Sequence, residues 1–207
     1  MHLHRSLIVA AVALAASALA HAVPVTSLPA GTVYPFAVEN YFGIGPKVVA
    51  PGITWSADDS NSVYGYAGAY GFAGNGGWSG LSMIGSNTGA SSMRIDFASP
   101  VAGVGAFMNY APDFGTTPTI AVYDSSNVLL ESYTLSFATG GGSNTGEFHG
   151  FLEGTSNISY LTLTGSYIGA ANLSVQTVAV PVPEPETYAL MLAGLAAIGF
   201  VARRRQA

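Results

Sequence analysis

Five aromatic side chains are interleaved with regularly spaced glycines in one short stretch of the chain. Glycine falls at every third position from Gly65 to Gly80, and the aromatic residues of the stretch are Tyr64, Tyr66, Tyr70, Phe72 and Trp78. Flat aromatic faces stack on sugar rings, and glycine lets the backbone pass close to a ligand. The stretch is therefore a candidate glycan platform. The alternative is a glycine-rich loop whose rings pack over the end of the domain. Burial of apolar surface stabilises a fold by ~25 cal/mol per Å², so folding alone could explain the presence of these rings.

Residues suited to acid, base or thiol catalysis are scarce. The chain has no cysteine, which excludes disulfides, zinc-thiolate sites, iron-sulfur clusters and a cysteine nucleophile. His149 is the one histidine outside the first 21 residues, and its place between Phe148 and Gly150 in a strand-like stretch favours a structural role. No G-x-S-x-G, Walker or dinucleotide-binding motif is present. A polysaccharide hydrolase would need two carboxylates facing a cleft, about 5 to 10 Å apart.

The adjacent polar residues Asp58-Asp59-Ser60-Asn61 could offer oxygen ligands or an acid, but such a cluster before a strand is typical of a turn. Thr162 and Thr164 lie on one face of an expected strand. An ice-binding surface would need many more threonines than this single pair, so the face is expected to be an ordinary solvent-exposed one.

The positions of these residues depend on an all-β body. Met93, Ile95 and Phe97 alternate with polar Arg94 and Asp96, the period-two pattern of a half-buried strand. Further strands are expected at residues 33–38, 52–56, 101–110, 119–123, 128–137, 147–152, 158–164 and 173–180. A hairpin loop is expected at residues 124–127 and a flexible glycine-rich link at residues 139–144. Many short strands without an amphipathic helix predict one two-sheet β-sandwich over residues 23–180.

The charge of this body excludes one class of partner. Residues 23–180 keep only Lys47 and Arg94 as cations against nine carboxylates, a net charge of −7. Nucleic-acid binding depends on Lys and Arg contacts to phosphate, so a nucleic-acid partner is excluded.

The first 22 residues have the pattern of a signal peptide. Arg5 precedes an apolar run over residues 7–19, and Ala20 and Ala22 supply the small side chains at −3 and −1 of a signal peptidase site. Export through the Sec translocon is expected, with a mature chain that begins near Val23.

The last residues form a three-part tail. The segment Val182-Pro183-Glu184-Pro185 is expected to stay extended, because proline fixes φ and lacks an N–H, and to stay solvated because of its glutamate. Residues 187–202, as a helix rising 1.5 Å per residue, would span roughly 24 Å against a hydrocarbon core of about 30 Å. Arg203, Arg204 and Arg205 then act as a basic stop, which favours a cytoplasmic C-terminus.

This tail, over residues 181–207, resembles the PEP-CTERM sorting signal of exported proteins in exopolysaccharide-producing Gram-negative bacteria. The resemblance implies transient anchoring in the inner membrane and processing by an exosortase, a membrane protease that removes the helix. It further implies delivery of the processed protein to the cell surface or extracellular matrix. A permanent C-terminal anchor is the alternative.

The strand series over residues 33–180 also resembles the jelly-roll ectodomains common among PEP-CTERM proteins, many of which are similar to galactose-binding-like sandwiches. The resemblance carries over no cofactor. It leaves a structural calcium ion as an open question, with Glu39 and Asn172 as possible contributors, although a hard cation prefers several oxygen ligands that include carboxylates.

Three functions remain open at this point. The first is a non-enzymatic surface or matrix protein that associates with exopolysaccharide in a biofilm and binds glycan through residues 64–78. The second is a purely structural or adhesive sandwich without a small ligand, which predicts that these aromatic residues are buried. The third is a polysaccharide-acting hydrolase.

Overall fold

The computed structural model describes residues 22–177. The expected signal peptide up to residue 21, the sorting tail over residues 181–207 and its helix over residues 187–202 lie outside the described residues. Within residues 22–177, no helix has the length and hydropathy that a membrane crossing requires. Ala22, expected at −1 of the signal peptidase site, is the first described residue and is buried against the core.

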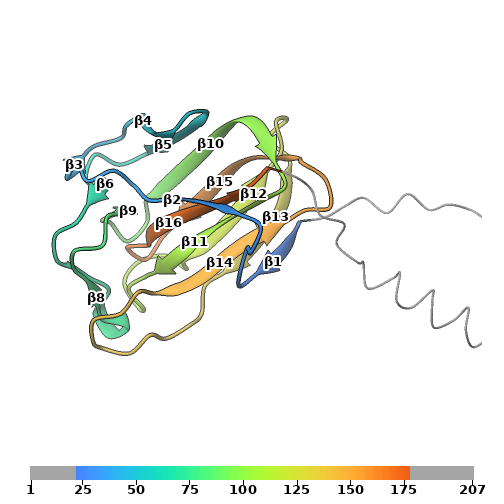
Figure 1. The fold of residues 1–207 in the computed structure, drawn as a ribbon. Helices are drawn as coiled ribbons and strands as arrows, with labels where there is room; N and C mark the ends of the chain where they lie inside the picture. The colour runs from blue at the N-terminus through green and yellow to red at the C-terminus, as the bar shows by residue number, and fades with distance from the viewer. Residues whose placement is uncertain (1–21, 178–207) are drawn as a thin grey trace, which may run out of the picture.

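Two antiparallel sheets form the body of the protein (Figure 1). The strands of the larger sheet are β1 (Val23–Val25), β2 (Thr32–Tyr34), β3 (Tyr41–Phe42), β6 (Val63–Tyr66), β9 (Met83–Gly85), β11 (Gly103–Asn109), β14 (Glu147–Leu152) and β16 (Gly169–Gln176). Their order is β1-β14-β11-β16-β9-β6-β3, and β2 pairs with β16 beside this path.

The strands of the smaller sheet are β4 (Lys47–Ala50), β5 (Ile53–Ala57), β10 (Ser92–Val101), β12 (Thr119–Tyr123), β13 (Leu129–Thr134) and β15 (Ile158–Thr164). Their order is β13-β12-β15-β10-β5-β4. A separate two-stranded ribbon of β7 (Tyr70–Gly71) and β8 (Gly77–Trp78) surrounds a 3-10 turn at Ala73–Asn75. The described part of the chain is thus an all-β two-sheet sandwich.

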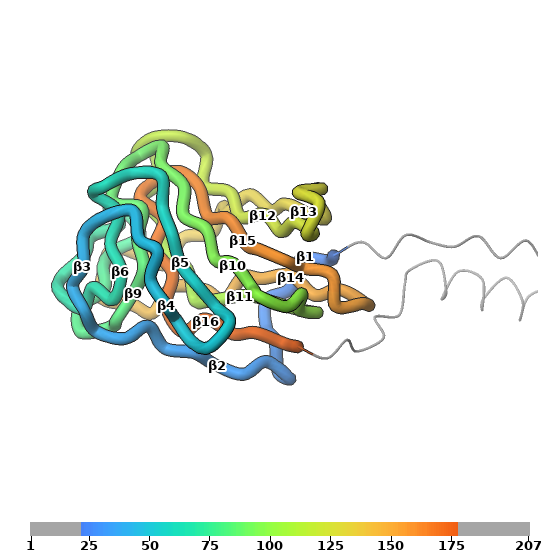
Figure 2. The backbone as a smooth tube through the Cα atoms, turned by 90° about the horizontal axis from the view of Figure 1, so that it is seen from above, coloured from blue at the N-terminus to red at the C-terminus, as the bar shows by residue number. Residues whose placement is uncertain are grey.

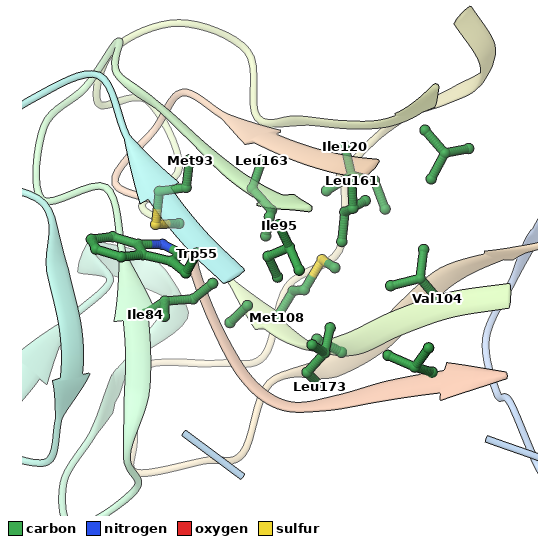
Figure 3. Packing of buried hydrophobic residues seen from close by; sticks show 14 of the residues in the cluster. Trp55, Ile84, Met93, Ile95, Val104, Met108, Ile120, Leu161, Leu163 and Leu173 are labelled. Carbon is green, nitrogen blue, oxygen red and sulfur yellow. The ribbon is translucent and has the colours of Figure 1, made fainter. Parts of the chain in front are cut away.

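The core lies between the two sheets and follows from strand alternation. In β10, Met93 and Ile95 are fully buried, whereas Arg94 points to the opposite face. Side chains of the larger sheet, including Val104, Met108 and Leu173, meet them from the other side (Figure 3). Each such buried side chain contributes roughly 1.5–3 kcal/mol relative to exposure.

The two ends of the described chain lie at the same end of the sandwich. Val23 pairs with Leu152, Leu152 pairs with Gly103, and Gly103 pairs with Gln176 on its other side. Figures 1 and 2 show β1 and the end of β16 at one end of the sandwich, with β3, β6 and β9 at the other. The glycine-rich aromatic stretch therefore lies away from the termini.

Several strand boundaries differ from the expectation. The strand expected at residues 33–38 ends at Tyr34, the one expected at 128–137 ends at Thr134, and the one expected at 173–180 begins at Gly169. Strands β1, β3, β4, β6, β7, β8 and β9 were not predicted. They have two to four residues each, which is too short to display a period of two.

Candidate functional site

The glycine-rich aromatic stretch forms regular secondary structure and not a loop. It contains β6, the ribbon of β7 and β8, and the 3-10 turn between them. The glycine period of three is only partly required by the structure, because a Cβ at Gly71 or Gly74 would meet nothing within 4 Å. Gly65 is different: its φ is 62°, and a Cβ there would lie 2.0 Å from the Ala37 carbonyl oxygen. Only glycine fits at that position.

Three of the five predicted platform rings are core residues. Tyr64 and Phe72 are 0% exposed and Trp78 is 2% exposed, whereas Tyr66 and Tyr70 are half-buried. Tyr64 packs in the main core, 5.5 Å from Trp55 between ring centroids, and its hydroxyl donates to the Val48 carbonyl at 3.0 Å. A platform of five exposed rings is therefore not formed, because period-two alternation and the ribbon turn the rings inward.

The rings other than Tyr64 build a second, smaller core. Phe72 and Trp78 lie 4.9 Å apart between centroids, and Tyr70 lies 5.0 Å from Phe72. Val63, Met83 and Ala171 complete this cluster. Burial raises the pKa of Tyr70, so its phenol stays neutral. These contacts favour the packing alternative for the stretch.

A partly buried amide network that the sequence did not reveal holds the link at residues 139–144 against this cluster. Asn144 Oδ1 accepts from Trp78 Nε1 at 3.2 Å, from Asn109 Nδ2 at 3.1 Å and from the Gly146 N–H at 2.9 Å. The Asn75 carbonyl accepts from Asn109, Asn144 and Thr139 at 3.0, 2.9 and 2.8 Å. The link expected to be flexible is thus fixed at several points along its length.

His149 has a structural environment. Its ring is stacked on Phe137 at 4.9 Å and on Tyr133 at 5.4 Å between centroids. Glu147 Oε2 lies 3.6 Å from its Nε2. Burial lowers the pKa of His149, because the charged imidazolium loses its solvation there.

The residues considered as oxygen ligands have other contacts. Asp59 accepts from the Asn61 N–H at 2.8 Å, as expected for a turn, whereas Asp58 accepts at 2.8 Å from the N–H of Ser92, which is distant in sequence. Glu39 is paired with Lys47 at 2.6 Å. Asn172 has a φ of 54° at a register shift of β16, a conformation that asparagine tolerates. In residues 22–177, no three His, Asp or Glu side chains gather as a metal site.

The outer face of the smaller sheet presents a different set of side chains. Register aligns Tyr123, Tyr160 and Asp96 in one row across β12, β15 and β10. The next row contains Ser132, Ala121, Thr162, Arg94 and Ser56. A third row contains Thr134, Thr119, Thr164 and Ser92. The pair of threonines noted in the sequence thus belongs to a broader hydroxyl-bearing face.

The first row ends at a recess of about 240 Å³. The ladder between β10 and β15 opens there, because Asp96 pairs with Tyr160 but the next pair is Val101 with Ile158. Residues 97–100 therefore lie opposite Ser159 alone. Such a bulge changes the direction of the side chains next to it. Pro100 contributes to the irregularity, because proline has no N–H to donate to the neighbouring strand. The polar residues that line the recess, besides Tyr160, are Arg94, Asp96, Asp124, Ser125, Asn127 and Ser159.

The side chains of this recess are held by one another. The Arg94 guanidinium lies 3.6 Å above the centroid of the Tyr160 ring and is paired with Asp96 at 2.5 Å. Tyr123 stacks on Tyr160 at 4.7 Å between centroids with an interplanar angle of 10°. The Tyr160 hydroxyl donates to Asn127 Oδ1 at 3.1 Å. Burial raises the pKa of Tyr160, so this hydroxyl keeps its proton.

The expected hairpin loop at residues 124–127 forms and provides the opposite wall. Asp124 Oδ1 accepts from the N–H groups of Ser126 and Val128 at 2.8 and 2.9 Å. Asn127 takes the left-handed conformation, with a φ of 62°. The turn residues therefore do two things at once, because they close the hairpin and line the recess.

Comparison with known families identifies the C-terminal tail. Residues 181–205 match the PEP-CTERM protein-sorting motif. The chain is thus an all-β sandwich protein that carries a PEP-CTERM sorting signal at its C-terminus. This motif implies export, exosortase processing and sorting to the cell surface.

Comparison with solved structures returned lectin modules among the matches, at low TM-scores. A histidine mutant of the lectin binding domain of lectinolysin complexed with Lewis b has a TM-score of 0.36 and 12% identity, covering 70% of this chain and 100% of that chain. A fucose binding module of Streptococcus pneumoniae has a TM-score of 0.32 and 11% identity, covering 46% and 72%. A search of curated proteins found no match to this chain.

Proposed function

We propose that this protein is a non-enzymatic surface or extracellular-matrix protein that associates with exopolysaccharide after export. The observation that carries the proposal is the sorting motif over residues 181–205, placed directly after a folded sandwich. In this proposal the Sec translocon and signal peptidase act first, near Ala22. The tail then anchors the chain transiently in the inner membrane until an exosortase cuts near Pro183-Glu184-Pro185.

The proposal includes a jelly-roll or galactose-binding-like subtype for the sandwich. The interleaved strand order of the two sheets supports this subtype, since neighbours such as β11 and β16, or β10 and β15, are distant in sequence.

The acidic charge of the body is compatible with a neutral glycan matrix. Residues 23–180 have a net charge of −7, so uncharged polysaccharide is a better partner than a polyanion.

A purely structural or adhesive sandwich is the second candidate. The burial of Tyr64, Phe72 and Trp78 favours it, because those rings serve folding. It predicts an exported protein that is retained in the matrix by protein contacts and not by polysaccharide.

Hydrolysis of polysaccharide is a weaker candidate. A glycosidase needs one carboxyl group that carries a proton and another that does not. Asp96 and Asp124 both line the recess, but the first is paired with Arg94 and the second accepts from two backbone N–H groups. Both carboxyl groups are therefore engaged in contacts that hold the fold together.

The test is intact-mass analysis and fractionation of the protein in the bacterium that produces it. The proposal predicts a species that begins near Val23, ends near Pro185, lies outside the inner membrane and co-purifies with exopolysaccharide. A species that keeps Arg203 to Arg205 and remains in the inner membrane would contradict it. An exported, processed species that separates fully from polysaccharide would instead favour the structural candidate.

A further inference from the structure

One group in the recess at the end of β10 has a polar atom that the fold leaves unused. The hydroxyl oxygen of Ser159 is buried and has no hydrogen-bond partner among residues 22–177. A buried hydroxyl without a partner costs about 1–3 kcal/mol. Ser159 lies opposite the bulge at residues 97–100 and lines the recess, so a ligand there would lie beside a hydroxyl that has no internal partner.

Two neighbours offer further free hydrogen-bonding positions. Arg94 uses Nε and Nη2 on Asp96, which leaves Nη1 without a partner in the described part of the chain. Asp124 uses Oδ1 on two backbone N–H groups, and its Oδ2 accepts no hydrogen bond from the described residues. The recess therefore combines a fixed donor, a fixed acceptor and a hydroxyl.

The donor and the acceptor are held in place before any ligand arrives. Arg94 is fixed by Asp96 on one side and by the face of Tyr160 on the other. Asp124 is fixed by the hairpin turn that it caps. Preorganised groups bind more tightly, because less conformational entropy is lost on binding.

The charge and the size of the recess limit the class of ligand. Arg94 stands against Asp96 and Asp124, so the recess has a net charge of −1, which disfavours phosphates and carboxylates. A hard cation needs more oxygen ligands than the carboxylates of Asp96 and Asp124 supply, and Asp96 is already paired with Arg94. The volume of about 240 Å³ lies below the ~300–1,000 Å³ of sites for drug-sized ligands, which suits a single ring.

We infer that this recess binds one uncharged pyranose residue of a polysaccharide. Sugar hydroxyls donate and accept at the same atom, which matches a donor from Arg94, an acceptor on Asp124 and the hydroxyl of Ser159. The hydroxyl-bearing rows beside the recess continue the surface along which further sugar residues would lie. This inference rests on the proposed association with exopolysaccharide and gives it a site.

Affinity electrophoresis of the exported full-length gene product tests the inference. Native gels contain either the exopolysaccharide of the producing bacterium, the neutral polymer dextran or the anionic polymer alginate. Ser159→Ala and Arg94→Gln are compared with the wild type and with Ser82→Ala. Ser82 is the matched control, because its hydroxyl is also buried without a partner in the described chain but lies outside the recess.

The expected result is retardation of the wild type and of Ser82→Ala by a neutral polymer. Ser159→Ala and Arg94→Gln should bind about tenfold more weakly, the loss of one or two hydrogen bonds. The thermal midpoints of Ser159→Ala and Ser82→Ala should rise together, because each variant removes a buried hydroxyl without a partner. The midpoint of Arg94→Gln should stay close to that of the wild type, because surface ion pairs contribute little.

Three results would overturn the inference in distinguishable ways. Equal retardation of all variants would keep the proposed function and place the glycan elsewhere. Retardation abolished by EDTA and restored by calcium, or release of reducing sugar that Asp124→Asn prevents, would replace it by a metal-dependent or hydrolytic site. Absence of retardation of the wild type in all three gels would remove the polysaccharide association itself.

Discussion

The indole Nε1 of Trp78 donates to Asn144 Oδ1 at 3.2 Å, across 66 positions of sequence. This bond ties the aromatic ribbon to the glycine-rich link, so two segments that look loop-like in the sequence form one closed end of the sandwich. Asn144 is central to that closure, because the same oxygen also accepts from Asn109 and Gly146.

Replacement of Asn144 by alanine should therefore destabilise the fold. Trp78 Nε1 would lose its acceptor and the buried Asn109 amide would lose one of its partners, at about 1–3 kcal/mol for each unsatisfied group. We expect a loss of about 2–4 kcal/mol in the free energy of unfolding, measured by urea titration. Ser143→Ala, an exposed neighbour, should change it by less than about 0.5 kcal/mol. Equal midpoints for the two variants would contradict this account of the link.

Trp78 distinguishes packing from glycan binding in the aromatic stretch. Trp78→Ala should cost about 3–5 kcal/mol, since the ring is 2% exposed. Trp78→Phe should cost less and should leave polysaccharide retention per folded molecule unchanged. A folded Trp78→Phe protein that lost retention would show that the indole contacts the glycan.

His149 should make stability depend on pH in the mildly acidic range. Burial lowers the pKa of His149 in the folded protein, so the unfolded chain binds the proton first as pH falls. This contribution to stability is complete above the ordinary value of about 6.5 and is lost as pH falls below it, by at most about 1.4 kcal/mol per pH unit.

The measurement is the thermal midpoint between pH 7.5 and 5.5 for the wild type and for His149→Phe, which keeps an aromatic ring beside Phe137. The wild type should lose more stability than the variant over that range. Parallel curves would mean that another group carries the dependence.

The sorting motif should be required for processing. Alanines in place of Pro183, Glu184 and Pro185 should leave a full-length tail with the three terminal arginines in the inner-membrane fraction, detected by intact mass. Glu186→Ala changes the same segment outside that triplet and should be processed normally. Normal processing of the triple variant would contradict the role assigned to the motif.

The sequence predicted the features that depend on local pattern. The alternation around Ile95 placed β10 correctly, and the turn residues before Asn127 marked a real hairpin. The glycine period was an incomplete guide, because the need for glycine follows local backbone geometry, which some positions of the repeat meet and others do not. Gly65 belongs to the repeat, but Gly76, whose Cβ would lie 2.0 Å from the Gly142 oxygen, does not.

The recess could not be predicted, because it depends on register. Arg94, Asp124 and Ser159 come from three segments that become neighbours only when β10, β12 and β15 pair and the bulge opens. One signal was present: Arg94 is one of two cations in residues 23–180, and Asp96 lies on the same face of its strand. An isolated cation on a polar strand face is a useful pointer to such a site.

The position of β16 in the larger sheet has a mechanical consequence. This strand leads directly to the C-terminal end of the described chain, and it is hydrogen-bonded to β11 on one side and to β9 and β2 on the other. Tension applied through the tail pulls β16 along its own axis, so its backbone hydrogen bonds are loaded together in shear and not broken one after another. A domain held by this end in flowing liquid is therefore tethered through a strand that pairs with three others.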